Sequence, residues 1–131
     1  MSFDFTVETS RGMNEVIEQL ESALKEDQFG VLWDFDLTEK LQEKGMDFAT
    51  PYRILEVCNP KEAQHVLSVN KTAGYFLPCK LVVFEDNGKT KVGMPKPTSL
   101  IGLADSPELF SIAEDIEKRL ISAIHKAIDR K

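Results

Sequence analysis

The stretch LVVFEDNGKTKVGM, residues 81–94, carries the most specific structural signal in the sequence. Two apolar runs flank Asn87-Gly88, a preferred pair for a tight two-residue β-turn. With this pair as the turn, Val83 pairs with Val92 on one face of the hairpin. The same register places Cys79 on the face of Val83, which we expect to point toward the helices and the core.

Periodic apolar residues extend the prediction outward from this hairpin in both directions. Strands are predicted at residues 3–8, 29–37 and 52–58, and helices at residues 13–24, 38–44, 60–67 and 107–128. The residues between Pro95 and Ser106 show no such period and are predicted to form a loop. This order of elements predicts an α+β fold, a two-layer sandwich of a mainly antiparallel sheet with helices on one face. The length of 131 residues fits one domain, residues 1–131.

Composition and charge exclude several classes of function. The net charge of −6 argues against a nucleic-acid or anionic-membrane partner. No apolar run has the roughly 18 residues expected of a spanning helix, and the first residues lack the pattern of a signal peptide. The sequence therefore predicts a soluble, cytoplasmic protein. Two cysteines are too few for a disulfide scaffold, so each thiol is a candidate functional group.

Cys58 ends a predicted strand and directly precedes the start of a helix. Asn59 suits the cap and Pro60 the first helical position. Because a helix N-terminus favours negative charge, a thiol here can have a lowered pKa and become a reactive thiolate. The alternative is a cysteine buried in the core, where free cysteines are common.

Cys79 follows Pro78 at the start of the hairpin and by default occupies a core position. If the strand ending at Cys58 pairs beside the hairpin, the two thiols can converge into a disulfide or a soft-metal site. Zinc or copper would suit such sulfur ligands, and Asp36 or His65 can complete the shell.

Positive charge concentrates in the second half of the chain. The lysines between residues 71 and 96 include Lys80, which directly follows Cys79. They indicate either a solvated surface or a site for a small anion.

Several segments resemble one known family. They are YRILEVCNP at residues 52–60 with Ala63, FLPCKLVVFED at residues 76–86, and FGVL at residues 29–32 followed by Asp36. Together they resemble the signature of the bacterial and archaeal domain-of-unknown-function 302 family. The resemblance implies a compact, dimeric α+β domain with no established reaction. It also implies that the family's characteristic positions fall at Cys58, Asn59, Pro60, Pro78 and Cys79.

Three functions follow as hypotheses. The first is a module that binds a small ligand or a soft metal ion at the two-cysteine corner. Its candidate ligand-binding residues are Asp36, Asn59, Pro60, Pro78 and Lys80, and its candidate metal ligands are Cys58, Cys79 and His65. No general base is identifiable in the sequence, which ranks this hypothesis first.

The other two hypotheses are a thiol enzyme and a structural dimer. In the enzyme, redox or persulfide chemistry uses the catalytic pair Cys58, the attacking thiolate, and Cys79, the resolving thiol. In the homodimer, a second apolar stripe on the last helix, at Phe110, Ile121 and Ile128, forms the contact. The alternative for this stripe is deeper burial of the helix in its own core.

Overall fold

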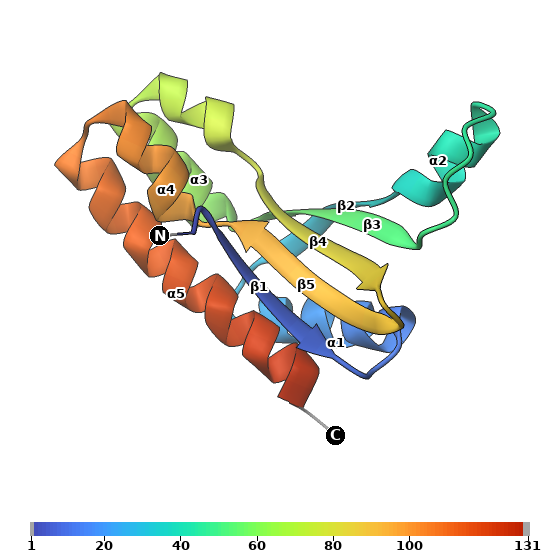
Figure 1. The fold of residues 1–131 in the computed structure, drawn as a ribbon. Coiled ribbons are helices and arrows are strands. Elements are labelled where there is room, and N and C mark those ends of the chain that lie inside the picture. The colour runs from blue at the N-terminus through green and yellow to red at the C-terminus, as the bar shows by residue number, and fades with distance from the viewer. Residues whose placement is uncertain (1, 130–131) are drawn as a thin grey trace.

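The computed structural model describes residues 2–129 and confirms the predicted α+β class (Figure 1). Five strands form one sheet in the order β1-β5-β4-β3-β2, and all neighbouring strands are antiparallel. Here η denotes a 3-10 helix. In chain order, the elements are β1 (Asp4–Thr9), α1 (Met13–Glu26), β2 (Gly30–Asp36), α2 (Leu37–Glu43), β3 (Tyr52–Cys58), α3 (Pro60–Val69), η1 (Lys71–Phe76), β4 (Cys79–Asp86), β5 (Lys89–Pro95), α4 (Pro97–Ile101), η2 (Gly102–Ala104) and α5 (Pro107–Asp129).

The β4–β5 hairpin has the predicted register, with Val83 opposite Val92. Asn87 and Gly88 have φ angles of 52° and 76°. Both lie in the left-handed region, which a two-residue hairpin turn of this type requires and which Asn and Gly tolerate best. The turn chemistry therefore fixes the register of the two strands beside Cys79.

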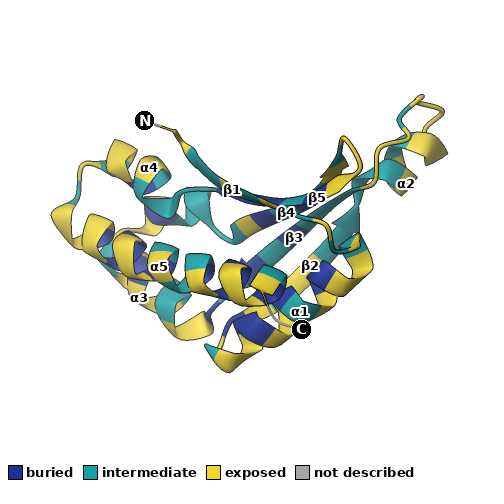
Figure 2. Ribbon diagram, turned by 60° about the horizontal axis from the view of Figure 1, so that its bottom comes forward, coloured by how far each residue is buried: buried dark blue, intermediate teal, exposed yellow. Residues whose placement is uncertain are grey.

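The core lies between one face of the sheet and the helices α1 and α5 (Figure 2). Alternate residues of each central strand point into it, as the period of a strand requires. Fully buried side chains on the sheet side include Leu55, Val57, Leu81, Val83 and Val92. On the helical side they include Val16, Leu20, Leu24, Leu120 and Ile124.

Arg119 of α5 joins three helices at the edge of this core. Its guanidinium donates to the carboxylate of Asp27, at the end of α1, over 2.8 Å, and lies 3.7 Å from the carboxylate of Glu62 in α3. The same group stacks over the ring of Phe29, 4.9 Å from the ring centroid. One side chain therefore ties α1, α3 and α5 together.

The segments between the predicted elements differ from expectation. The predicted loop after Pro95 contains α4 and η2, and residues 71–76 form η1. These short helices lack a full amphipathic period, so periodicity could not reveal them. On α5, Ile121 and Ile128 pack against the core of their own chain, whereas Phe110 is 41% exposed. The predicted dimer stripe therefore belongs largely to the core.

The segment between β2 and β3 projects from the body of the molecule (Figure 1). It contains α2, none of whose residues is buried. Asp36 caps this helix by accepting a hydrogen bond from the Glu39 backbone N–H at 2.9 Å. Across residues 2–129, no helix is both long and apolar enough to cross a membrane.

Replacing Leu20 by Ala tests the packing of α1 on the sheet. Leu20 is fully buried, so Leu20→Ala should lower the free energy of unfolding by about 2–5 kcal/mol. The matched change Leu103→Ala, at a side chain that is 79% exposed, should alter it by less than about 0.5 kcal/mol. Urea denaturation measures both, and equal losses would contradict the assigned core.

Candidate functional site

Cys58 is the last residue of β3, where it lies opposite Gly30 of β2. Its side chain is half-buried. Since side chains alternate along a strand, Cys58 points away from the face that carries the buried Val57. The thiol therefore lies outside the core, on the other side of β3.

The helix that follows Cys58 does not lower the pKa of the thiol as expected. Asn59 is the cap of α3, and its side-chain oxygen accepts from the backbone N–H groups of Lys61 at 3.1 Å and Glu62 at 3.2 Å. These donors are already satisfied by the cap, while partial burial raises the pKa of Cys58. This direction is opposite to the one expected for a thiol at a helix N-terminus, and its cause is the partial burial of the Cys58 thiol.

Cys79 opens β4 and lies opposite Val57 of β3. This pairing confirms that β3 lies beside the hairpin and that Cys79 shares the core-facing side of the sheet with Leu81 and Val83. Burial raises the pKa of the Cys79 thiol to about 11, with a smaller contribution from the neighbouring Cys58. Cys79 is therefore a neutral thiol at physiological pH.

The structure brings the two thiols near each other without joining them. Both are free cysteines. Cys79 pairs with Val57 rather than with Cys58, so the alternation of β3 directs the two sulfurs toward different faces of the sheet. This arrangement differs from a corner at which both sulfurs face one ligand.

The other predicted metal ligands lie apart from the cysteines. His65 is exposed on α3. Asp36 lies at the opposite end of β2 from Gly30, the partner of Cys58, which is about 20 Å along a strand. Among the side chains described, no group of three His, Cys, Asp or Glu residues gathers so that it could hold a metal ion.

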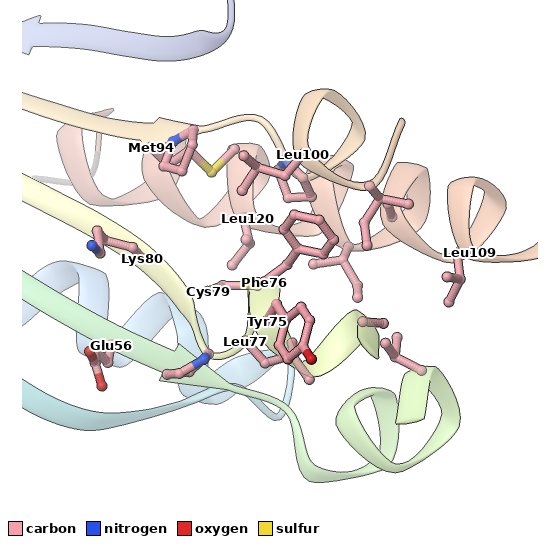
Figure 3. A pocket seen from close by; sticks show the side chains of 18 residues that line it. Glu56, Tyr75, Phe76, Leu77, Cys79, Lys80, Met94, Leu100, Leu109 and Leu120 are labelled. Atoms are coloured by element: carbon pink, nitrogen blue, oxygen red, sulfur yellow. The ribbon is translucent and has the colours of Figure 1, made fainter. Parts of the chain in front are cut away.

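A cavity of about 350 Å³ lies beside Cys79, at the end of the sandwich where η1 and α4 approach the sheet and α5 (Figure 3). Of the predicted ligand-binding residues, Pro78 and Lys80 line it, whereas Asp36, Asn59 and Pro60 do not. The lining residues are Glu56, Val66, Ala73, Tyr75, Phe76, Leu77, Pro78, Cys79, Lys80, Met94, Pro95, Pro97, Leu100, Ile101, Leu109, Ala113, Ile116 and Leu120.

Side-chain caps hold the two short helices that wall the cavity. Asn70 accepts from the backbone N–H of Thr72 at 2.9 Å and so starts η1. Glu117 of α5 accepts from both the backbone N–H of Thr98, at 3.1 Å, and its hydroxyl, at 2.7 Å. The first turn of α4 is therefore fixed to α5, which keeps a wall of the cavity in place.

The cavity is apolar inside and polar at one side. Its deep wall includes the buried Met94, Leu109 and Leu120. Glu56 and Lys80 face each other across β3 and β4, and Figure 3 shows them together at one side of the cavity. Such a site suits a small molecule that has an apolar body and a polar group.

Sequence reasoning identified Cys79 but missed most of the surrounding walls. Many of the missed residues come from η1 and α4, two short helices that the sequence did not predict. The clustering of Tyr75, Phe76 and Leu77, and of Leu100 and Ile101, between turn-forming residues was the available signal. It shows that these segments are apolar but not which surface they enclose.

This α+β fold and its sequence place the chain in a known family. The model of the domain of unknown function DUF302 matches residues 5–127, so the chain belongs to this family, as its motifs predicted. A solved structure described as an uncharacterized conserved protein DUF302 from Bacillus stearothermophilus is 60% identical in sequence. The match covers 97% of this chain and 99% of that chain, with a TM-score of 0.94. No protein with a curated function matches this chain.

The raised pKa values predict slow alkylation of both thiols. Cys58→Ser leaves only Cys79, whose rate of reaction with N-ethylmaleimide should rise with pH toward a midpoint of about 11. Cys79→Ser leaves only Cys58, whose midpoint should lie above the free-thiol value of about 8.5. The rise occurs because the thiolate is the reacting form. A midpoint for Cys58 below about 7.5 would restore the activated thiolate and contradict this account.

Proposed function

We propose that this chain is a binding module for a small, largely apolar molecule, and that its site is the cavity beside Cys79. The observation that carries the proposal is the cavity itself: about 350 Å³, walled by four helical segments and the ends of three strands. This volume lies within the range of about 300–1,000 Å³ that is typical of small-molecule sites.

The lining indicates the chemistry of the ligand. Aromatic and aliphatic side chains such as Phe76, Leu100 and Met94 offer dispersion contacts and exclude water from an apolar body. Lys80 and Glu56 border the cavity at one side, although strand alternation places their side chains on the opposite face of the sheet from Cys79. The proposed ligand is therefore a largely apolar molecule whose body enters the cavity.

Cys79 contributes to this site as part of its wall. With its pKa raised to about 11, the thiol is protonated and behaves as a small, polarisable and weakly polar surface. This role requires no partner sulfur, and Cys58 does not line the cavity. The proposal thus keeps one of the two predicted cysteines at the binding site.

The other hypotheses have less support. A thiol enzyme needs a reactive thiolate, and burial raises the pKa of both thiols. A zinc or copper site at the cysteines needs further ligands, yet among the described residues no group of three His, Cys, Asp or Glu side chains could hold a metal ion. A dimer through α5 needs a free apolar stripe, and two of its three residues pack in their own core.

Blocking the cavity tests the proposal. The probe is 8-anilinonaphthalene-1-sulfonate, which has apolar rings and one anionic group and fluoresces when it leaves water. The wild-type chain should bind it saturably. Leu100→Trp places a larger ring at the cavity wall and should weaken binding at least about tenfold.

The matched control is Leu103→Trp, which adds the same ring at an exposed position outside the cavity lining. It should leave the dissociation constant unchanged. Equal affinity of the wild-type chain and Leu100→Trp would refute the proposed site.

A further inference from the structure

The cavity lies where the pairing of two neighbouring strands stops. The ladder between β4 and β5 ends at the pair Val82–Gly93, although β4 begins three residues earlier and β5 continues two residues further. Lys80 and Met94 lie on these two strand ends and line the cavity (Figure 3). The ends of β4 and β5 beyond their ladder therefore both contribute to the cavity wall.

Pro95 explains why the ladder stops. β5 is a central strand, between β1 and β4. The hairpin register, continued by two residues, places Pro95 opposite Lys80. A bonded pair of an antiparallel ladder exchanges two hydrogen bonds, and one of them needs the N–H that proline lacks. A proline in a central strand is therefore expected only where the ladder is interrupted or ends.

Two hydrogen bonds show which way the backbone groups of this pair point. Successive residues of an antiparallel strand bond alternately to one neighbouring strand and to the other. The Glu85 N–H donates over 3.1 Å to the residue before β3, so Lys80, five residues earlier, presents its backbone groups to β5. The Lys96 N–H donates over 2.8 Å to the residue before β1, so Pro95 presents its backbone groups to β4. The Lys80 carbonyl therefore points toward Pro95, which cannot donate to it.

The backbone donors near this carbonyl are missing or already used. Pro78, Pro95 and Pro97 line the cavity and have no N–H. The N–H groups of Leu77 and Lys96, next to these prolines, donate to other carbonyls of the chain. At these five positions the wall offers no backbone donor to a ligand, whereas the Lys80 carbonyl is an acceptor.

Among the described residues, the lining turns no charged side chain toward a ligand. Its charged residues, Glu56 and Lys80, carry their side chains on the face of the sheet opposite Cys79. The Cys79 thiol is neutral at physiological pH, because burial raises its pKa to about 11. An ion in such a site would lose its hydration without gaining a partner of opposite charge. The cavity therefore selects against an ionised group.

We propose that the ligand of this cavity is an uncharged, largely apolar molecule with one hydroxyl or N–H group, which donates to the Lys80 carbonyl. This ligand class depends on the proposed binding function and specifies it further. The ligand supplies the hydrogen bond that Pro95 cannot give, while the apolar walls receive the rest of the molecule. A molecule of the same shape without a donor leaves the carbonyl unpaired, which costs affinity.

Two naphthalene derivatives test the donor. 2-Naphthol carries a hydroxyl, and 2-methoxynaphthalene has the same rings with a methyl group in place of that hydrogen. Both are uncharged at neutral pH, and the ether is more apolar, so apolar burial alone favours the ether. The wild-type chain should nevertheless bind 2-naphthol between about twofold and tenfold more tightly. Displacement of 1-anilinonaphthalene fluorescence measures both affinities.

Pro95→Ala supplies the missing backbone donor. The new N–H can pair with the Lys80 carbonyl within the sheet, so this variant should lose the preference for 2-naphthol. Pro107→Ala is the matched control, because it replaces an exposed proline outside the cavity lining. It should keep the wild-type preference. Circular dichroism melts show whether both variants fold, and the comparison of the two compounds on the wild-type chain requires no variant.

A second pair of probes tests the charge. 1-Anilinonaphthalene is uncharged, and 8-anilinonaphthalene-1-sulfonate is the same molecule with an added sulfonate. The uncharged probe should bind the wild-type chain at least about fivefold more tightly, because the cavity offers the sulfonate no cation. Fluorescence titration measures both dissociation constants.

Three results would overturn the proposed ligand class. They are equal affinity of the wild-type chain for 2-naphthol and its ether, an undiminished preference for 2-naphthol in folded Pro95→Ala, and tighter binding of the sulfonate than of the uncharged probe. Failure of the proposed binding function gives a different result. The wild-type chain then binds none of these probes, or Leu100→Trp leaves their binding unchanged, and the ligand class falls with the site.

Discussion

The packing of α1 and α5 on one face of the sheet sets the position of every other feature. Five strands give the sheet two faces, and two long helices are enough to cover only one of them. The buried side chains of β3, β4 and β5 lie on the face that the helices cover. Arg119 ties α1, α3 and α5 together at the edge of the core. One face becomes the core, and the other keeps apolar residues without a helical partner.

The cavity arises where this cover ends. Beyond the buried centre of the sheet, η1 and α4 close the end of the sandwich, and their caps, Asn70 and the Glu117–Thr98 pair, fix them there. Cys79 lies at the start of β4, so it enters the wall of this space. Its raised pKa follows from the same burial that makes the cavity apolar. The apolar cavity and the neutral thiol therefore share one physical cause.

Much of the fold could be predicted from the sequence because turn and cap residues act on neighbours only a few positions away. The Asn87-Gly88 turn fixed the hairpin register, and the Asn59-Pro60 cap marked the start of α3, as the structure confirms. The core-facing orientation of Cys79 followed from that register. These features depend on neighbours within a few residues, so a single sequence was sufficient.

The site needed information that local sequence does not contain. The raised pKa of Cys58 follows from its partial burial at the end of β3, which only the folded chain determines. The separation of Asp36 from the cysteines depends on the antiparallel pairing of β2 with β3. The cavity walls come from short helices whose apolar residues have no period. Each depends on tertiary arrangement rather than on propensity.

The central claim is that the cavity beside Cys79 binds a ligand. The most direct test is whether a bound ligand protects this one thiol from alkylation. The wild-type chain is alkylated with N-ethylmaleimide at alkaline pH, with and without saturating 8-anilinonaphthalene-1-sulfonate, and each cysteine is followed by peptide mass spectrometry. Since Cys79 lines the cavity and Cys58 does not, the dye should slow modification of Cys79 several-fold and leave Cys58 unchanged. Unchanged modification of Cys79 at saturating dye, or equal protection of both thiols, would contradict the account.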